Sequence, residues 1–260
     1  MNPFKQLHAG PDVLVLPNAW DAGSARVIEL AGAKAIATSS AAVAWAHGYP
    51  DGEALSFDIL LNVVREIARV VSVPITADIE AGYAVDDTVV DNVEYLIDAG
   101  VTGINIEDGK ASPDELADKI HAIKDQHGDE IWINARTDVF LHNLAQGEAA
   151  YDETVKRARK YRDAGANSIF IPMCVDEAML VRFVKAIDAP INSLAWVGLP
   201  PVARLREIGI RRLSAGSGIA KTSLGQIYEM AQVFLADGRS EPMTGPLAIP
   251  GGLNANMKRD

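Results

Sequence analysis

Short apolar runs alternate with longer amphipathic stretches along the 260 residues of the chain. Each run is rich in Val, Ile, Ala and Leu and has almost no polar interruption, which is typical of parallel strands covered on both faces. The predicted strands are Val13–Asn18, Ala35–Ser40, Pro74–Glu80, Gly103–Asp108, Ile131–Thr137, Ser168–Met173, Ile191–Trp196 and Arg212–Ala215.

A helical pattern follows each predicted strand, with apolar positions that recur every three or four residues. End signals support this reading, since Asp21 can cap the first helix and Gly32 can end it. Only the connection after the second strand, Ala41–Ser56, is long. The predicted helices lie near Asp21–Ala31, in a stretch that ends near Val71, and near Asp86–Ala99, Pro113–Gln126, Glu148–Ala164, Asp176–Ile187, Pro201–Glu207 and Ile219–Ala236.

Eight strand–helix repeats in one chain of this length predict an α/β fold, a closed parallel (β/α)8 TIM barrel. The alternative is an open doubly wound sheet, which needs a Gly-rich phosphate turn after its first strand. Here that turn reads P-N-A-W-D-A-G-S, without G-x-G-x-x-G spacing. We therefore expect a single barrel domain over residues 1–260. Residues 238–260 form an irregular tail that covers a surface or a neighbouring subunit.

The net charge of −11 narrows the range of partners. Nucleic acids and anionic membranes are bound by basic patches, so neither is expected here. A single cysteine, Cys174, cannot form an intramolecular disulfide and is expected to be a core thiol. The N-terminus has no hydrophobic signal core, and no apolar run is long enough to span a bilayer. These features predict a soluble cytoplasmic protein.

The stretch Ile75–Tyr83, I-T-A-D-I-E-A-G-Y, suggests chemistry. Residues two apart on a strand face the same side, so Asp78 and Glu80 are expected to project together. Two carboxylates at such a short distance repel each other unless a cation or a proton lies between them. Carboxylate ligands suit Mg²⁺ or Mn²⁺, although a solvated acidic turn is the alternative. The next strand, Gly103–Asp108, also ends in two acids, which favours the metal site.

The active site of such a barrel lies at the C-terminal ends of the strands. The second to fifth strands end in polar residues, whereas the sixth and seventh end in uncharged sequences. The predicted site is an acidic arc with one arginine, made of Ser39, Ser40, Asp51, Asp78, Glu80, Glu107, Asp108, Arg136 and Asp138.

Several of these residues have two readings. Arg136 can form a planar fork for a carboxylate or phosphonate, or a structural ion pair with Asp138 or Asp108. His47 is a candidate acid or base, but a surface histidine is the simpler interpretation. Asn105 faces the same side of its strand as Glu107 and is expected to line the barrel interior.

The loop A-G-S-G-I-A-K-T-S at 215–223 resembles a phosphate loop only in composition. Its spacing does not match G-x-x-x-x-G-K-[ST], because Ala220 precedes Lys221. It is interpreted as the turn into the last helix, with an auxiliary anion contact as the alternative.

Six motifs together resemble the isocitrate lyase / phosphoenolpyruvate mutase superfamily along nearly the whole chain. They are P-N-A-W-D-A-G-S-A-R at 17–26, A-T-S-S-A-A-V-A at 37–44, G-Y-P-D-G-E at 48–53, T-A-D-I-E-A-G-Y at 76–83, G-I-N-I-E-D at 103–108 and I-N-A-R-T-D at 133–138. The resemblance implies a barrel whose last helix is exchanged with a neighbouring subunit, commonly in a dimer of dimers. It also implies Mg²⁺-assisted making or breaking of a C–C or P–C bond beside a 2-oxo or 2-hydroxy acid.

The resemblance assigns roles residue by residue. Asp78 matches the carboxylate in direct contact with the metal, Glu80 and Glu107 match the other metal-shell acids, and Asp51 matches an acid of the metal's water network. Arg136 matches the arginine that holds the substrate's anionic group. The substrate's carboxylate cradle corresponds to Ser39, with the backbone around Ser40 and Ala41.

Departures from the family pattern narrow the expected reaction. Isocitrate-type lyases carry K-[KR]-C-G-H after the fourth strand, where this chain reads E-D-G-K-A-S-P-D-E-L. The gating loop of the mutases is longer, and Lys110 is the only lysine nearby. We therefore expect a Mg²⁺-dependent carbon–carbon lyase acting on a small 2-oxo or 2-hydroxy acid, as in decarboxylation of an oxaloacetate-like acid. The alternatives are a phosphonomutase or P–C hydrolase, and a non-catalytic barrel that binds 2-oxo acids.

Overall fold

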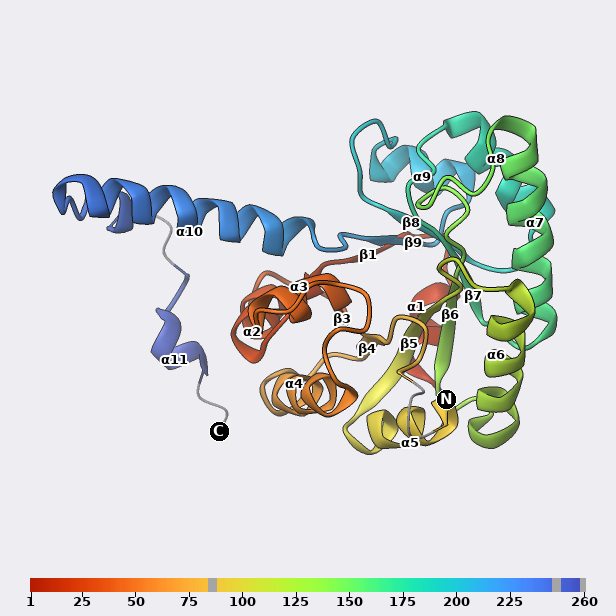
Figure 1. The fold of residues 1–260 in the computed structure, drawn as a ribbon, viewed down its shortest axis with the longest axis horizontal. Coiled ribbons are helices and arrows are strands. Elements are labelled where there is room, and N and C mark those ends of the chain that lie inside the picture. Colours follow the sequence, from red (N-terminus) through yellow and green to blue (C-terminus); the bar gives the residue numbers. More distant parts are fainter. Residues whose placement is uncertain (84–87, 245–248, 258–260) are drawn as a thin grey trace.

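The chain folds, in the computed structural model, into a nearly closed ring of parallel strands surrounded by helices (Figure 1). The structure describes residues 1–83, 88–244 and 249–257. The strands are β1 (Leu14–Leu16), β2 (Asn18–Ala19), β3 (Ile36–Thr38), β4 (Ile75–Asp78), β5 (Val101–Glu107), β6 (Trp132–Arg136), β7 (Ser168–Ile171), β8 (Ile191–Leu194) and β9 (Arg212–Ser214). The ring confirms the predicted barrel.

The first predicted strand is divided into β1 and β2 at Pro17. Its first half pairs with β9 and its second half with β3, so one segment closes the ring from both sides. Proline has no N–H for a ladder, which explains the break at this residue. The Asn18 side chain spans the seam, because its Nδ2 donates to Thr38 O at 2.7 Å and its Oδ1 accepts from Gly216 N at 2.8 Å.

Helices cover the outside of the ring, and the pattern-based predictions locate most of them. The helices are α1 (Pro3–His8), α2 (Ala22–Leu30), α3 (Ser40–Ala46), α4 (Phe57–Val70), α5 (Val89–Asp98), α6 (Pro113–His127), α7 (Gly147–Asp163), α8 (Glu177–Ala186), α9 (Val202–Ile208), α10 (Gly218–Asp237) and α11 (Leu253–Met257). Asp21 caps α2 through Ser24, as predicted. The start predicted for α5 at Asp86 lies outside the described residues.

The second predicted strand is too long, because Ser40 already belongs to α3. Ser39 caps this helix by accepting from Ala42 N at 3.5 Å. The alanine-rich sequence that follows has strong helix propensity, which explains why the connection after the second strand contains a helix that the sequence analysis did not predict. As a consequence, Ser39 and Ser40 lie at a strand-to-helix turn.

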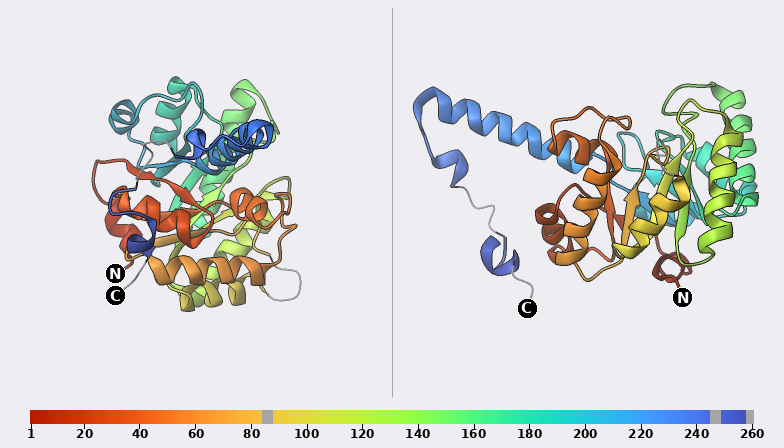
Figure 2. Two further views of the ribbon diagram at one scale, coloured as in Figure 1. Left: turned by 90° about the vertical axis from the view of Figure 1, so that its left-hand side faces the viewer. Right: turned by 60° about the horizontal axis from the view of Figure 1, so that its bottom comes forward.

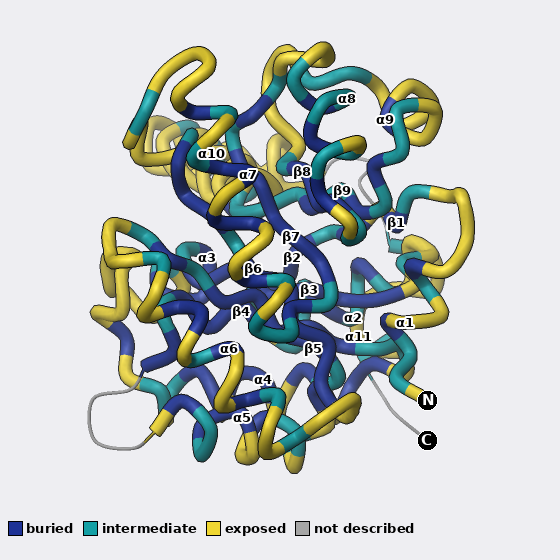
Figure 3. Tube along the Cα trace, turned by 90° about the vertical axis from the view of Figure 1, so that its right-hand side faces the viewer, coloured by how far each residue is buried: buried dark blue, intermediate teal, exposed yellow. Residues whose placement is uncertain are grey.

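The short helix α1 seals the N-terminal end of the barrel. Phe4 is fully buried there and packs against Gly103, where an added Cβ would come within 3.1 Å of its ring. The His8 ring stacks on Trp132 with centroids 4.7 Å apart. The strands form the dark interior of Figure 3, whereas the outer turns of the helices are exposed. A buried apolar core of this kind is the main stabilising contribution to the fold.

The last long helix, α10, stands away from the barrel in Figures 1 and 2. Ala220 is the only buried residue along its fully described length. Its exposed large apolar side chains are Ile219, Leu224, Ile227, Tyr228, Phe234 and Leu235. The tail then returns to α2, where Arg26 Nε donates to Asn256 O at 2.8 Å. Among the described residues no helix, α10 included, combines the length and apolar character needed to cross a bilayer.

Candidate active site

A cavity of about 650 Å³ lies at the C-terminal ends of the strands, where barrel enzymes hold their active sites. A larger hollow of about 900 Å³ lies at the opposite end, around Asn2 and Trp132, and has none of the predicted site residues. We therefore place the candidate site in the smaller cavity. Six predicted site residues line it, namely Ser39, Ser40, Ala41, Asp51, Asp78 and Arg136.

Asp78 ends β4 and is 8% exposed. Its Oδ2 accepts from both the backbone N and the Oγ of Ser40 at 3.1 Å. Its Oδ1 is sealed from solvent and has no hydrogen-bond partner among the described residues. A buried carboxylate oxygen without a donor is costly unless a cation compensates it. This oxygen is therefore suited to a metal ligand.

Glu80 does not continue the strand, because β4 ends at Asp78 and Glu80 has a φ of +48°. The prediction that both acids project together from one strand end is therefore wrong in its geometry. The Glu80 carboxylate accepts from Tyr83 Oη at 2.7 Å and from Glu53 N at 2.5 Å, in the wall beside the cavity. Burial raises the pKa of Glu80, and the charges of Asp51 and Asp78 raise it further.

Arg136, at the end of β6, holds two carboxylates. Its Nη1 lies 2.5 Å from Glu107 Oε2, and its Nε and Nη2 reach the two oxygens of Asp138 at 2.6 and 3.0 Å. The interpretation of Arg136 as a partner of Asp138 is thus confirmed, while Asp108 has other partners. Glu107 and Asp138 together fix the orientation of the Arg136 guanidinium, one edge of which faces the cavity.

Glu107 has the most perturbed carboxyl group near the cavity. Burial raises its pKa to about 9, against the opposing effect of the Arg136 charge, and the nearby Asp78 charge adds to the rise. Burial and Asp78 also raise the pKa of Asp51. Four acids from different elements are thus close enough to repel one another. A carboxyl whose pKa is raised in this way keeps its proton to a higher pH than usual even beside the Arg136 guanidinium, and a divalent cation would displace that proton.

This effect makes stability and Mg²⁺ affinity depend on pH. Because the folded pKa of Glu107 lies above its usual value of 4.5, the folded state binds the extra proton. Without metal, the free energy of unfolding should fall as pH rises from about 5 to 9, with this group contributing at most about 1.4 kcal/mol per pH unit. Mg²⁺ competes with the same proton, so its affinity should rise over this range.

Chemical denaturation in EDTA and Mg²⁺ titration calorimetry at pH 6, 7.5 and 9 measure the two trends. Glu107→Gln removes the titrating group and should flatten both slopes. Equal slopes in the variant and the wild type would contradict the assignment.

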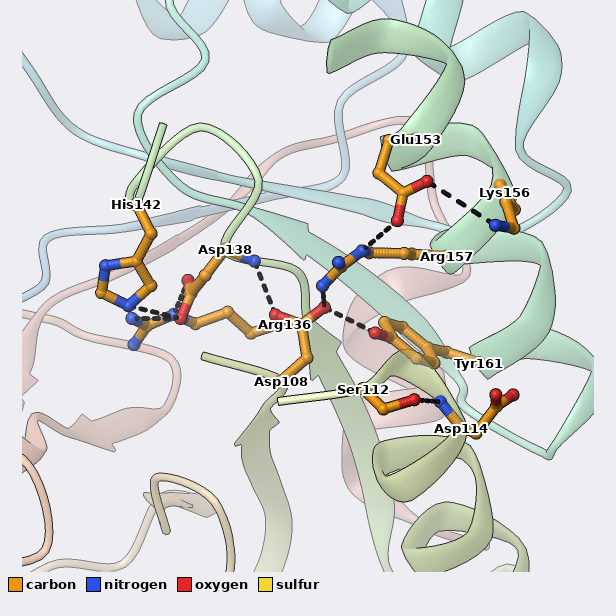
Figure 4. A network of polar contacts seen from close by, with 10 residues as sticks. All are labelled: Asp108, Ser112, Asp114, Arg136, Asp138, His142, Glu153, Lys156, Arg157 and Tyr161. Carbon is orange, nitrogen blue, oxygen red and sulfur yellow. Dashed lines mark hydrogen bonds and ion pairs between the residues drawn. The ribbon is translucent and has the colours of Figure 1, made fainter. Parts of the chain in front are cut away.

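Asp108 does not line the cavity, and Figure 4 shows its carboxylate directed toward Arg157, Tyr161 and the Asp138 backbone. Its Oδ1 accepts from Asp138 N at 2.8 Å, and its Oδ2 accepts from Tyr161 Oη at 2.5 Å and Arg157 Nη1 at 2.9 Å. The prediction that Asp108 belongs to the acidic arc of the site is therefore wrong. Its carboxylate instead binds side chains of α7 and the Asp138 backbone. The network orients Asp138 and, through it, Arg136.

Removing one donor from Asp108 should cost stability and leave the chemistry intact. Tyr161→Phe is expected to lower the free energy of unfolding by about 1–3 kcal/mol, because a buried charge loses a hydrogen bond. Urea denaturation measures the loss. Tyr95→Phe is the matched control at a ring that is 44% exposed, and should change stability by less than about 0.5 kcal/mol. An unchanged midpoint in Tyr161→Phe would contradict the role of this network.

Three further residues that the sequence analysis discussed, His47, Cys174 and Lys221, lie at different distances from the cavity. His47 lies at the end of α3 with Nδ1 3.0 Å from Val43 O, and is not part of the cavity lining. Cys174 is buried, and burial raises its pKa to about 12, which confirms a core thiol. Lys221, in the first turn of α10, lines the cavity as the alternative reading of its loop requires.

The sequence reading missed the opposite wall of the cavity. It is largely apolar and consists of Trp45, Leu141, Phe170, Pro172, Met173, Leu194, Trp196 and Leu224. These residues come from five separate strand–helix units, and each resembles an ordinary core or surface residue in the sequence. The signal that the sequence offered was the uncharged character of the sixth and seventh predicted strand ends, to which Phe170, Pro172, Met173, Leu194 and Trp196 belong.

The donor types fit a divalent cation, although no three His, Cys, Asp or Glu side chains form a ready-made ligand group within the described residues. The unpartnered Asp78 oxygen is the observation in favour. Glu107 and Glu80 are held by Arg136 and Tyr83 respectively. The assignment of Asp78, Glu80 and Glu107 as metal ligands stays a prediction.

Comparison with known proteins gives consistent matches. The family model described as phosphoenolpyruvate phosphomutase matches residues 4–235. The chain is 34% identical to protein Rv1998c of Mycobacterium tuberculosis H37Rv, over 94% of this chain and 93% of that protein. It is 32% identical to the 2-methylisocitrate lyase of Escherichia coli K12, over 72% and 67%. A solved structure from Burkholderia cenocepacia J2315, described as a "putative phosphonomutase", is 35% identical with a TM-score of 0.82, over 88% and 97%.

Proposed function

Because the chain belongs to the phosphoenolpyruvate phosphomutase family, within the isocitrate lyase / phosphoenolpyruvate mutase superfamily, we propose that it is a Mg²⁺-dependent lyase. Its substrate is a small 2-oxo or 2-hydroxy acid, and the bond cleaved is the C–C bond that releases a pyruvate-type enolate. Decarboxylation of an oxaloacetate-like acid is the simplest example. The observation that carries the proposal is the buried, unpartnered Asp78 oxygen in a cavity that also holds Arg136.

Asp78 would hold Mg²⁺ or Mn²⁺, with Glu80 and Glu107 as the further acids and Asp51 oriented toward bound water. When bound, the cation supplies Lewis-acid stabilisation of negative charge on the carbonyl oxygen. Ser40 fixes the Asp78 carboxylate through its N and Oγ. Arg136 would bind the substrate's carboxylate, and Ser39, Ser40 and Ala41 would line its other side.

Two features favour loss of a C3 substituent over both isocitrate-type cleavage and the mutase reaction. The cavity lining of described residues has neither Cys nor His, so the acid of isocitrate-type lyases has no counterpart. The connection between β5 and α6 is a tight turn, in which Ala111 N donates to Asp108 O at 2.8 Å. Such a turn is too short for a gating loop. Loss of carbon dioxide or of an aldehyde from C3 needs neither device, because solvent can return the proton.

The second candidate is a phosphonomutase or a P–C bond hydrolase. It is favoured by the name of the matching family model and by the 35% identity to the solved structure described as a phosphonomutase. A barrel that binds 2-oxo acids without turnover is the third candidate. A non-catalytic barrel does not explain why the chain keeps four acids whose mutual repulsion lowers the stability of the fold.

The decisive experiment is a substrate panel with Mg²⁺ and with EDTA. It contains oxaloacetate, substituted malates, citramalate-type acids, methylisocitrate and phosphonopyruvate, and both pyruvate and phosphate are measured. Pyruvate without phosphate from a carbon acid would support the lyase. Pyruvate with phosphate from phosphonopyruvate alone would favour the second candidate. No turnover, together with Mg²⁺-dependent binding, would favour the third.

We also propose that α10 packs on another copy of the chain, in a homodimer or a dimer of dimers. Its apolar side chains Ile227, Phe234 and Leu235 are 56%, 48% and 84% exposed, which is costly in water. Light scattering after size exclusion should therefore give at least twice the chain mass at micromolar concentration. Ile227→Asp with Leu235→Asp should shift the mass toward the monomer, and Glu229→Asp on the same helix serves as the control. A monomeric wild type would contradict the proposal.

A further inference from the structure

A layer of buried polar side chains crosses the barrel interior next to the candidate site. These side chains are at most 4% exposed and come from β5 to β9, namely Asn105, Asn134, Ser168, Asn192, Arg212 and Ser214. Asn105 and Ser214 also line the cavity. Buried polar groups must satisfy one another, so the direction of each hydrogen bond in the layer can be deduced.

The first constraint enters from Trp132 at the closed end of the barrel. Its indole Nε1 donates to Ser168 Oγ at 2.9 Å. Since an indole N–H only donates, the Ser168 hydroxyl must use its own hydrogen elsewhere, and it lies 2.7 Å from Asn134 Oδ1. The Asn134 amide nitrogen therefore faces Asn105, and it donates to Asn105 Oδ1 at 2.7 Å.

The second constraint comes from Arg212 on β9. Its Nη2 donates to the same Asn105 Oδ1 at 3.2 Å, and its Nε donates to Ser214 Oγ at 3.2 Å. A guanidinium, like an indole, has no acceptor. Two N–H donors, Asn134 Nδ2 from β6 and Arg212 Nη2 from β9, thus meet at the one oxygen of Asn105. Rotating the Asn105 amide by 180° would turn its N–H groups against both donors.

The orientation of Asn105 therefore follows from chemistry. Its oxygen is taken by Asn134 and Arg212, so its Nδ2 is the end left for the cavity. No partner for this nitrogen occurs in the part of the chain that the structure describes. In the ladder Asn105 is the direct neighbour of Asp78. A pair of fixed N–H donors thus lies beside an acid whose free oxygen only accepts.

We propose that Asn105 is a ligand-binding residue whose amide N–H groups donate to a negatively charged oxygen of the bound 2-oxo acid. The ligand class rests on the proposed function, whereas the orientation of the amide does not. A fixed donor needs no reorganisation as charge develops on the ligand, which is the basis of oxyanion stabilisation. Arg212 and Trp132 contribute by preventing the amide from turning.

Oxalate is a suitable probe, because it is a planar, stable mimic of a pyruvate enolate. Its affinity in the presence of Mg²⁺ can be measured by calorimetry on the full chain. Asn105→Asp keeps an oxygen facing Arg212 and Asn134, so the fold should be retained, but it presents an acceptor to the cavity. Asn105→Thr is uncharged, offers Oγ1 to the same donors and removes the amide N–H groups. Both should weaken oxalate binding at least tenfold.

The matched controls are Asn192→Asp and Asn192→Thr. Asn192 is buried in the same layer and bonded to Ser214, but it does not line the cavity. These variants should bind oxalate within about threefold of wild type, at a similar cost in melting temperature.

Oxalate binding by Asn105→Thr at wild-type strength would overturn the inference, even if Asn105→Asp were weak, since added charge alone would then explain the loss. A wild type that releases pyruvate yet binds no oxalate would also overturn it. The first result does not depend on the lyase reaction, and the second is read only after the substrate panel has established that reaction separately.

Discussion

Asp78→Ala is expected to abolish Mg²⁺-dependent turnover, with a loss of at least about 10³-fold in kcat/KM. Among the described residues, Asp78 Oδ1 is buried with neither a hydrogen bond nor an ion pair, whereas Glu107 Oε2, which also lacks a hydrogen bond, is paired with Arg136. Without it, the cation loses its central ligand and the developing charge loses several kcal/mol of stabilisation. A loss of about 4 kcal/mol corresponds to three orders of magnitude in rate.

Two measurements separate a lost metal site from a damaged fold. Calorimetry should show no Mg²⁺ binding by the variant, while its melting temperature without metal stays equal or rises, because a buried uncompensated charge has been removed. Asp78→Asn retains the contact with Ser40 and removes only the charge, so it should be equally inactive. Asp163→Ala, at an exposed position on α7, is the active control. Turnover within tenfold of wild type in Asp78→Ala would mean that the metal assignment is wrong.

Arg136→Lys is expected to lower kcat/KM by about 10²- to 10³-fold. The arginine uses three nitrogens to hold Glu107 and Asp138 at once, and a lysine ammonium cannot reproduce this planar fork. The substrate's carboxylate would then bind a mobile lysine ammonium group in place of the fixed edge of the arginine guanidinium. The loss should include a higher KM, because ground-state binding is affected as well as the transition state.

Steady-state kinetics on the best substrate of the panel measure this split. Arg157→Lys is the matched control, since Arg157 lies on α7 and also binds a buried carboxylate, that of Asp108, but does not line the cavity. That control should lose stability and keep kcat/KM per folded molecule. A rise in KM of less than twofold in Arg136→Lys would contradict a role in binding substrate.

The sequence was most informative where a buried strand produces a continuous apolar run. All eight runs became barrel strands, and the ends of β4, β5 and β6 supplied Asp78, Glu107 and Arg136 as predicted. Errors occurred where local geometry overrode periodicity. Alternation along a strand failed at Glu80, since a residue in a left-handed conformation no longer faces the side that period two assigns.

Other features depend on contacts that no local pattern records. Asp108 resembled a site acid until α7 supplied Tyr161 and Arg157, which lie 53 and 49 residues further along the chain. Asn105 was predicted to line the interior, but its orientation depends on Arg212, 107 residues away. The Asp108 contacts follow from packing of α7 beside the strands, whereas the Arg212 contact follows from barrel closure, which brings side chains of β5 and β9 together in the interior.

The helix α10 connects the cavity mechanically to the outside of the barrel. Lys221 and Leu224 in its first turns line the cavity, whereas its outer turns touch little of their own chain. A rigid helix transmits a rotation at its far end to its first turns. A protein that binds the outer turns of α10 would therefore set the orientation of the cavity wall that Lys221 and Leu224 form. Catalysis and assembly would then be linked, so that specific activity depends on enzyme dilution.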